Sequence, residues 1–173
     1  MQPPDHRLKR LAETIEGLAA KDRQVLDRTR QIAEFRRKAA VEIHGACAEF
    51  VLSLNRLLSQ PQVVLDPPVF LPESFRESGQ NLLQINVRGR ILQIDFSATA
   101  ELVSTEEFRL PYILEGTVRA FNQQFLEKDI IEEQLIFYTL EKEKNLWRYF
   151  DPRTYRSGPF GQEYLVSLME RLV

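Results

Sequence analysis

The hydrophobic and polar positions in the first third of the chain repeat with the period of an α-helix. No proline lies between Pro4 and Pro61, and apolar residues recur at alternating spacings of three and four. This spacing places them on one face of a helix. It predicts one very long helix, or two helices nearly in line, ending before Pro61. The positions on this face are Leu8, Leu11, Ile15, Leu18, Val25 and Ile32.

The pattern changes after Lys38. Before it, a single apolar stripe is interrupted by Asp22 and later meets Arg36. From residue 39 to residue 59, apolar residues cover most of the helix circumference, which is typical of a helix buried on several sides. We therefore expect two parts: a projecting helical arm over residues 1–38 and an α+β globular domain over residues 39–173.

Strict alternation of apolar and polar residues predicts β-hairpins further along the chain. The first spans residues 82–98, with Arg88 and Gly89 at the turn. The second joins residues 135–140 to residues 146–150. An edge strand is expected near 63–65 or 69–71, in a proline-rich connection.

Residues 111–122 fit either a strand or a helix. We favour a strand because of Gly116 and the pair Thr117-Val118, with a helical turn near 122–129. A turn-rich loop is expected over 151–161. The final stripe predicts a C-terminal helix, with apolar positions at Tyr164, Leu165, Leu168, Met169 and Leu172. The sum is an α+β fold: a long N-terminal helix (arm plus core helix) packed on a four- to five-stranded antiparallel sheet with a C-terminal helix.

Composition is that of an ordinary water-soluble protein, with 43% hydrophobic and 28% charged residues and a net charge of −2. The single cysteine, Cys47, excludes an internal disulfide and fits a reducing compartment. No apolar run reaches the ~20 residues of a membrane span, and the first residues lack the layout of a signal peptide. We expect a cytoplasmic protein with no membrane partner.

Motifs for catalysis, metal binding or cofactor binding are missing from the sequence, which contains no glycine-rich phosphate loop and no Cys-x-x-Cys pair. His44 and Cys47 lie three residues apart, on one helix face. A nucleophile–base pair would need an open pocket, and we interpret both as residues at the core margin. No catalytic residue, cofactor or metal is expected, and the balance is against an enzyme.

Two stretches are candidates for binding. The first is a basic region of the arm that can neutralise phosphates, although interspersed acidic residues also fit a solvated helix face; it comprises Arg28, Arg30, Arg36, Arg37 and Lys38. The second is an aromatic and basic loop that can hold a ligand or partner, or serve as a rigid connector; it comprises Trp147, Tyr149, Arg153, Tyr155 and Arg156.

The leading hypothesis for function is a non-catalytic protein–protein interaction module. It self-associates through the arm, as a homodimer, and presents its sheet or the aromatic loop to a second protein. The reason is that burying each of these apolar side chains fully would stabilise the protein by ~1.5–3 kcal/mol relative to leaving it in water. The alternatives are a nucleic-acid-associated protein that uses the basic stretch, and a small-ligand binder or enzyme with a pocket near residues 151–160. The sequence leaves open whether the arms pair parallel or antiparallel.

Overall fold

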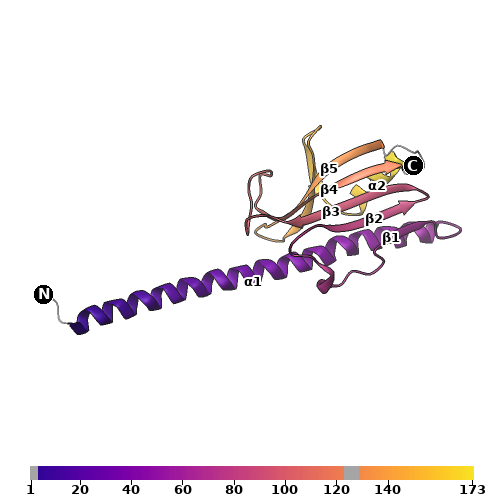
Figure 1. The fold of residues 1–173 in the computed structure, drawn as a ribbon. Helices are drawn as coiled ribbons and strands as arrows, with labels where there is room; N and C mark the ends of the chain where they lie inside the picture. Colours follow the sequence, from indigo (N-terminus) through magenta and orange to yellow (C-terminus); the bar gives the residue numbers. More distant parts are fainter. Residues whose placement is uncertain (1–3, 123–128) are drawn as a thin grey trace. The chain divides into compact units, whose positions relative to one another are not determined.

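The computed structural model describes residues 4–122 and 129–173 (Figure 1). Its helices and strands are α1 (Pro4–Leu57), β1 (Val63–Asp66), β2 (Asn81–Val87), β3 (Arg90–Ala98), β4 (Tyr112–Asn122), β5 (Asp129–Thr139), β6 (Leu146–Asp151), β7 (Arg156–Pro159) and α2 (Gln162–Leu172). The chain divides into two compact units, which we call the N-terminal unit (residues 1–34) and the sheet unit (residues 35–173). The helix α1 contributes to both. The long N-terminal helix, the antiparallel sheet and the C-terminal helix confirm the α+β class.

The sheet has seven strands, so the expected number of four to five was wrong. Each strand pairs antiparallel with the next one along the chain, in the order β1 to β7. Strand β7 lies within residues 151–161, which were expected to be a loop because Gly158 and Pro159 are turn residues. A strand at the edge of a sheet tolerates proline, since only one side of its backbone joins the ladder. The turn residues Gly158 and Pro159 were therefore misleading as signals of a loop.

Both predicted hairpins are confirmed, and so is the strand chosen for residues 111–122. Arg88 and Gly89 form a two-residue turn with positive φ angles of 52° and 87°. This is the conformation that the twist of a hairpin favours, and the Asn86 side chain accepts a 2.8 Å hydrogen bond from the Gly89 N–H. The helical turn expected near 122–129 falls on 123–128, outside the described residues.

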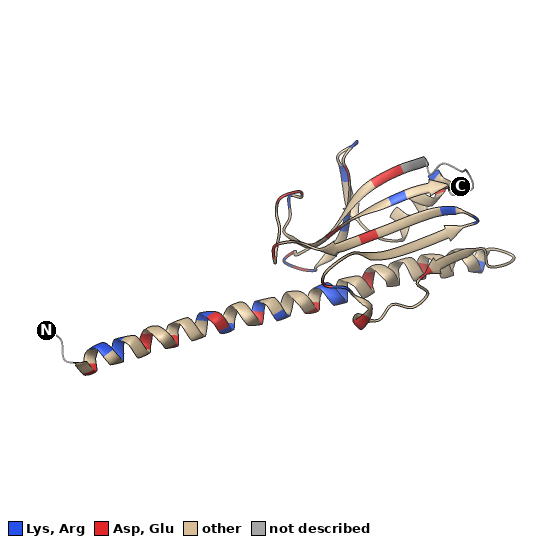
Figure 2. Ribbon diagram, viewed as in Figure 1, with Lys and Arg blue, Asp and Glu red and all other residues tan. Residues whose placement is uncertain are grey.

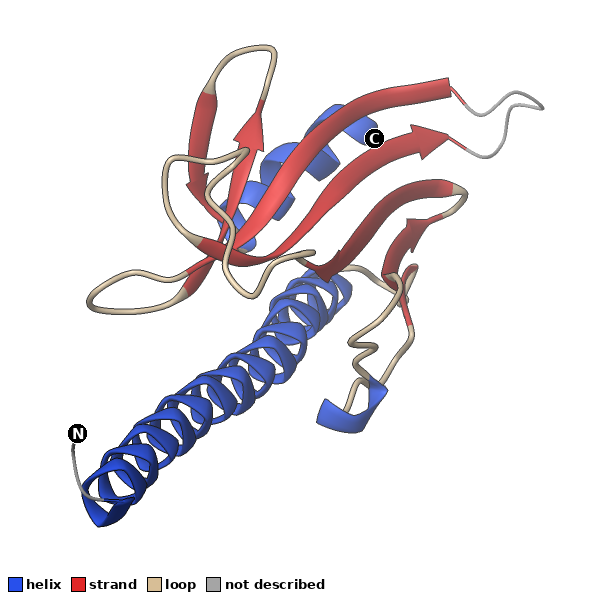
Figure 3. Cartoon of the chain, turned by 60° about the vertical axis from the view of Figure 1, so that its left-hand side comes forward, coloured by secondary structure: helices blue, strands red, loops and turns tan. Residues whose placement is uncertain are grey.

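One face of the sheet is covered by both helices of the sheet unit. The Trp147 indole N–H donates a 2.8 Å hydrogen bond to the Ala39 carbonyl of α1. Tyr149 stacks on Tyr164 of α2, with ring centroids 4.1 Å apart. Trp147 and Tyr149 are two residues apart on β6, so they point to the same face. Figure 3 shows α2 lying against the sheet, and the two helices therefore share the main core.

The opposite face carries a smaller aromatic cluster. Phe108 and Phe137 stack with centroids 4.9 Å apart, and Tyr112 packs on Phe137 at 4.7 Å. Because Phe108 lies between β3 and β4 in the chain, this cluster fixes the long 99–111 connection onto the sheet. The C-terminal half of α1 is joined to the sheet edge by Asn55, whose side chain accepts from the Val63 N–H and donates to the Val63 carbonyl.

Candidate interaction surfaces

The N-terminal unit carries a row of exposed apolar side chains, interrupted once at Asp22. Each is between 48% and 65% exposed, an unusual state for six large apolar residues on one helix face. We call this row the apolar face; it consists of Leu8, Leu11, Ile15, Leu18, Val25 and Leu26. The first five were expected from the sequence, whereas Leu26 was not. Ile32, also expected in the row, is only 3% exposed and does not belong to this surface.

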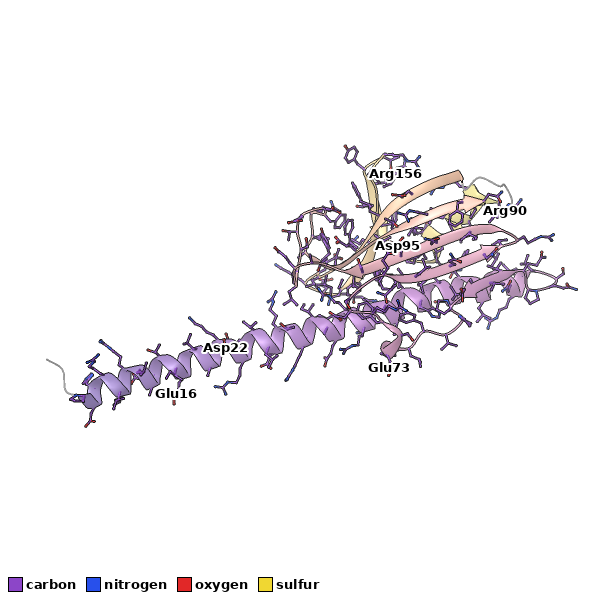
Figure 4. All side chains as sticks on the ribbon, in the orientation of Figure 1. Glu16, Asp22, Glu73, Arg90, Asp95 and Arg156 are labelled. Carbon is purple, nitrogen blue, oxygen red and sulfur yellow. The ribbon has the colours of Figure 1, made fainter. Side chains whose placement is uncertain are left out.

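Polar residues lie both within the stripe and on other sides of the helix. Thr29, which continues the same stripe, donates its hydroxyl to the Val25 carbonyl at 2.9 Å, so its polar atom is bonded within the helix. Asp22 lies in the middle of the stripe, and Glu16 is placed on another side of the helix by its periodicity (Figure 4). Charges of both signs alternate along this helix (Figure 2). The result is an amphipathic helix with one interruption.

Arg36 is buried and bonded within the sheet unit. Its Nε donates to the Ile113 carbonyl at 3.0 Å, and its Nη1 donates to Glu77 at 2.8 Å. Its Nη2 donates to the Thr99 hydroxyl at 3.1 Å and to the Leu102 carbonyl at 3.2 Å. With 6% of its surface exposed, this guanidinium cannot reach a phosphate without breaking those bonds. The structure therefore removes Arg36 from the predicted basic patch.

The other four residues of that patch are exposed: Arg28, Arg30, Arg37 and Lys38. Lys38 lies 4.0 Å from Glu42, one helical turn further along. Such exposed i,i+4 pairs stabilise a helix by only ~0.3–0.5 kcal/mol. The patch is thus smaller than the sequence suggested, and no described contact organises it.

The predicted aromatic loop is split by the structure. Trp147 is a core residue held by α1, and Tyr149 is half-buried against α2. Tyr155 is 81% exposed in a left-handed backbone conformation at the β6–β7 turn. Arg156 lies beside it, near the tip of the hairpin (Figure 4). These residues do not converge on one point.

A hollow of about 780 Å³ lies between the β6–β7 hairpin and α2, and Tyr149, Asp151 and Arg156 contribute to its lining. Gln134, Tyr164 and Arg171 of its lining also belong to a chain of polar contacts centred on Glu132. Arg171 and Gln134 each donate to Glu132 at 2.6 Å. These contacts attach α2 to β5.

The same series of polar contacts includes Tyr164 of α2 and Arg153 of the β6–β7 loop. The Tyr164 hydroxyl donates to Gln134 at 2.8 Å, and Arg153 lies 3.5 Å from Glu132. From the sequence, the pair Glu132-Glu133 was interpreted as part of a solvated edge or turn, whereas Glu132 is only 6% exposed. Only the strand register shows that Glu132 points to the helix-covered face.

Cys47 and His44 are both buried, as the core-margin interpretation expected. Burial raises the pKa of the Cys47 thiol to about 12, so the reactive thiolate is disfavoured at neutral pH. The His44 Nε2 lies 2.8 Å from the Pro67 carbonyl, which can only accept, so this nitrogen donates. His44 serves to attach the connection after β1.

A smaller hollow of about 190 Å³ is lined by acidic residues of the 99–111 connection and β4. Burial, followed by the charges of Glu107 and Glu106, raises the pKa of Glu115 there. Among residues 4–122 and 129–173, no three metal-ligating side chains come together. Within the same residues, no helix is long and apolar enough to cross a membrane.

Comparisons with protein-family models, with curated proteins and with solved structures found no match to this chain.

Proposed function

We propose that this protein is a non-catalytic protein–protein interaction module that forms a dimer through the apolar face of its N-terminal unit. The observation that supports this proposal is the row of six apolar side chains, each about half exposed or more, on a helix whose residues 4–31 are all exposed. Within one chain, these side chains keep between 48% and 65% of their surface exposed. A second copy supplies an identical surface and requires no further component.

The energies are of the right order. Fully burying one such side chain stabilises by about 1.5–3 kcal/mol. Two half-exposed faces of six residues therefore contribute roughly 10–20 kcal/mol on that scale. Association costs about 4–15 kcal/mol in lost translational and rotational freedom. The two terms are of the same order, so burial of both faces can offset the cost of association. In the dimer, the two sheet units remain available to a second protein.

A matched pair of full-length variants tests the proposal. Ile15→Asp introduces a charge in the apolar face, whereas Gln24→Asp introduces the same charge on the other side of the helix. Light scattering and sedimentation equilibrium should show a dimer for the wild type and for Gln24→Asp, and a monomer for Ile15→Asp. Circular dichroism should show that the sheet unit of both variants remains folded. A wild-type protein that stays monomeric up to about 100 μM, a concentration corresponding to ~5 kcal/mol of binding, would exclude the proposal.

A further inference from the structure

The apolar face has the same spacing in both directions along the helix. Five of its residues (Leu8, Leu11, Ile15, Leu18 and Val25), together with Asp22, follow a three–four alternation that is symmetric about the midpoint between Ile15 and Leu18. Leu26 lies beside this series. Reversing the helix about that midpoint superposes Leu8 on Val25 and Leu11 on Asp22. A two-fold axis can therefore pass through this point and pair the positions from Leu8 to Val25 with those of a second, oppositely directed copy.

Asp22 distinguishes the two orientations. In a parallel dimer in register, residues of the same number lie opposite each other, and the two Asp22 carboxylates meet within the apolar seam. Like charges placed together at an interface cost several kcal/mol in general, although Lys21 on the flank relieves part of that repulsion. In the antiparallel arrangement, Asp22 lies opposite Leu11 of the other copy.

The antiparallel arrangement also separates the two carboxylates. Residues 11 and 22 are eleven positions apart, which at ~1.5 Å per residue puts the two Asp22 side chains about 16 Å from each other along the axis. That is twice the screening length of about 8 Å at physiological salt. Arg7 and Arg28 then approach each other at the rim, where both are exposed and their repulsion is weak.

We infer that the partner of the apolar face is a second copy of this chain in antiparallel orientation, with Leu11 of each copy opposite Asp22 of the other. This inference depends on the proposed function. Asp22 weakens the dimer and at the same time selects its orientation, as a single polar residue at a seam position can. The apolar face is thus self-complementary, and the dimer contains two equivalent Leu11–Asp22 positions.

Two matched substitutions test the orientation. Leu11 and Leu18 are equally exposed, at 56%, and both occupy the same side of the stripe. In the antiparallel dimer, Leu11→Arg places each guanidinium opposite an Asp22 carboxylate, whereas Leu18→Arg places it opposite Ile15. We expect Leu11→Arg to change the dimer Kd by less than about 10-fold and Leu18→Arg to raise it by about 100-fold or more.

A double variant supplies the control for charge pairing. Asp22→Leu alone should tighten the dimer, because it removes a charge from the seam. Added to Leu11→Arg, it should weaken the dimer, because the new arginine loses its partner. Sedimentation equilibrium gives the Kd values, and circular dichroism checks that each variant keeps the wild-type helix content.

The outcomes separate the two proposals. A monomeric wild type overturns the proposed function itself. A dimeric wild type in which Leu11→Arg is as damaging as Leu18→Arg, or more so, overturns the antiparallel orientation and leaves the dimer in place. The same conclusion follows if both arginines are tolerated equally, because an arginine opposite Ile15 cannot be accommodated in the inferred seam.

Discussion

At the scale of single residues, the guanidinium of Arg36 joins parts of the sheet unit that are distant in sequence. It donates to the Ile113 carbonyl of β4, to the Thr99 hydroxyl and to the Leu102 carbonyl. It also donates to the Glu101 carbonyl at 3.4 Å and forms an ion pair with Glu77 at 2.8 Å. A planar group with five N–H donors can satisfy this many acceptors at once, and a lysine cannot. Arg36 is therefore a structural residue of the sheet unit.

The first prediction follows from this arrangement. Arg36→Met should destabilise the sheet unit by about 2–4 kcal/mol, because it leaves buried acceptors without donors. Arg36→Lys should recover only part of the loss. Arg37→Met is the matched control, since Arg37 is exposed, and should change the free energy of unfolding by less than about 0.5 kcal/mol. Urea unfolding at fixed protein concentration measures all three. Equal losses for Arg36→Met and Arg37→Met would contradict the structural role.

Gly116 supports a second prediction at this scale. It lies in the middle of β4, where a Cβ atom would overlap the Asp95 carbonyl oxygen and lie 2.7 Å from the Phe96 Cα. Both obstacles are backbone atoms of β3, which cannot rotate away. Gly116→Ala should therefore destabilise the protein by about 1–3 kcal/mol, as overpacking does.

The control for Gly116→Ala is a second glycine substitution, which should change stability in the opposite direction. Gly45 lies in α1, and apart from its chain neighbours and the adjacent helix backbone, no atom lies within 4 Å of where a Cβ would be. Gly45→Ala should stabilise the protein by about 0.5–1 kcal/mol, because alanine is the better helix former. Thermal unfolding distinguishes the two directions, and a stabilised Gly116→Ala variant would show that β3 and β4 are further apart than described.

At the scale of elements, the hairpin of β5 and β6 contains a bidentate ion pair. Arg148 donates to both carboxylate oxygens of Glu141, at 2.9 Å and 2.8 Å. The Thr139 hydroxyl donates to the same carboxylate at 2.6 Å. The hydrogen bond from Arg148 is the main cause that holds the pKa of Glu141 below its ordinary value.

The lowered pKa predicts a dependence of stability on pH. Glu141 loses its proton more readily in the folded state than in the unfolded state. Its ion pair with Arg148 therefore stabilises the folded protein at neutral pH. The contribution of this ion pair to stability is lost as the pH falls from the ordinary glutamate pKa of about 4.3 through the lower pKa of Glu141 in the folded protein. Glu141→Gln should cost about 1 kcal/mol at pH 7 and little at low pH. Urea unfolding across that range is the measurement, with the exposed Glu143→Gln as control; a cost independent of pH would contradict it.

The elements differ in how well the sequence predicted them. The hairpin at Arg88-Gly89 was predictable because alternation and turn chemistry agree there. Strand β7 was not, because Gly158 and Pro159 are turn residues whose tolerance at a sheet edge depends on the finished topology. Arg36 was misinterpreted for a related reason: its acceptors at residues 77, 99 and 113 are brought to it only by the fold. Five of the six residues of the apolar face needed only helical periodicity, whereas Leu26, the burial of Ile32 and the exposure of the face came from the structure.

At the scale of the whole molecule, the two units obtain their stability differently. The sheet unit has buried side chains from both helices and from its strands. Residues 4–31 of the N-terminal unit are all exposed, so their helix is held only by backbone bonds and neighbouring side chains. Isolated helices are marginal in water, and most helical stability in proteins comes from tertiary packing. If the proposed dimer forms, the stability of the N-terminal helix should therefore depend on it in a way that the stability of the sheet unit does not.

This difference leads to the last prediction, which concerns hydrogen exchange. Diluting the wild-type protein from well above to well below its dimer Kd should accelerate amide exchange in residues 8–26 by about 10-fold or more, because the monomer loses the packing that protects its helix. Exchange in β3 and β4 should stay the same over that dilution. Ile15→Asp should show fast exchange in residues 8–26 at every concentration, since it cannot bury the apolar face. Protection of residues 8–26 that is equally strong at both concentrations would mean that the helix is stable alone, and the link between its folding and dimer formation would be wrong.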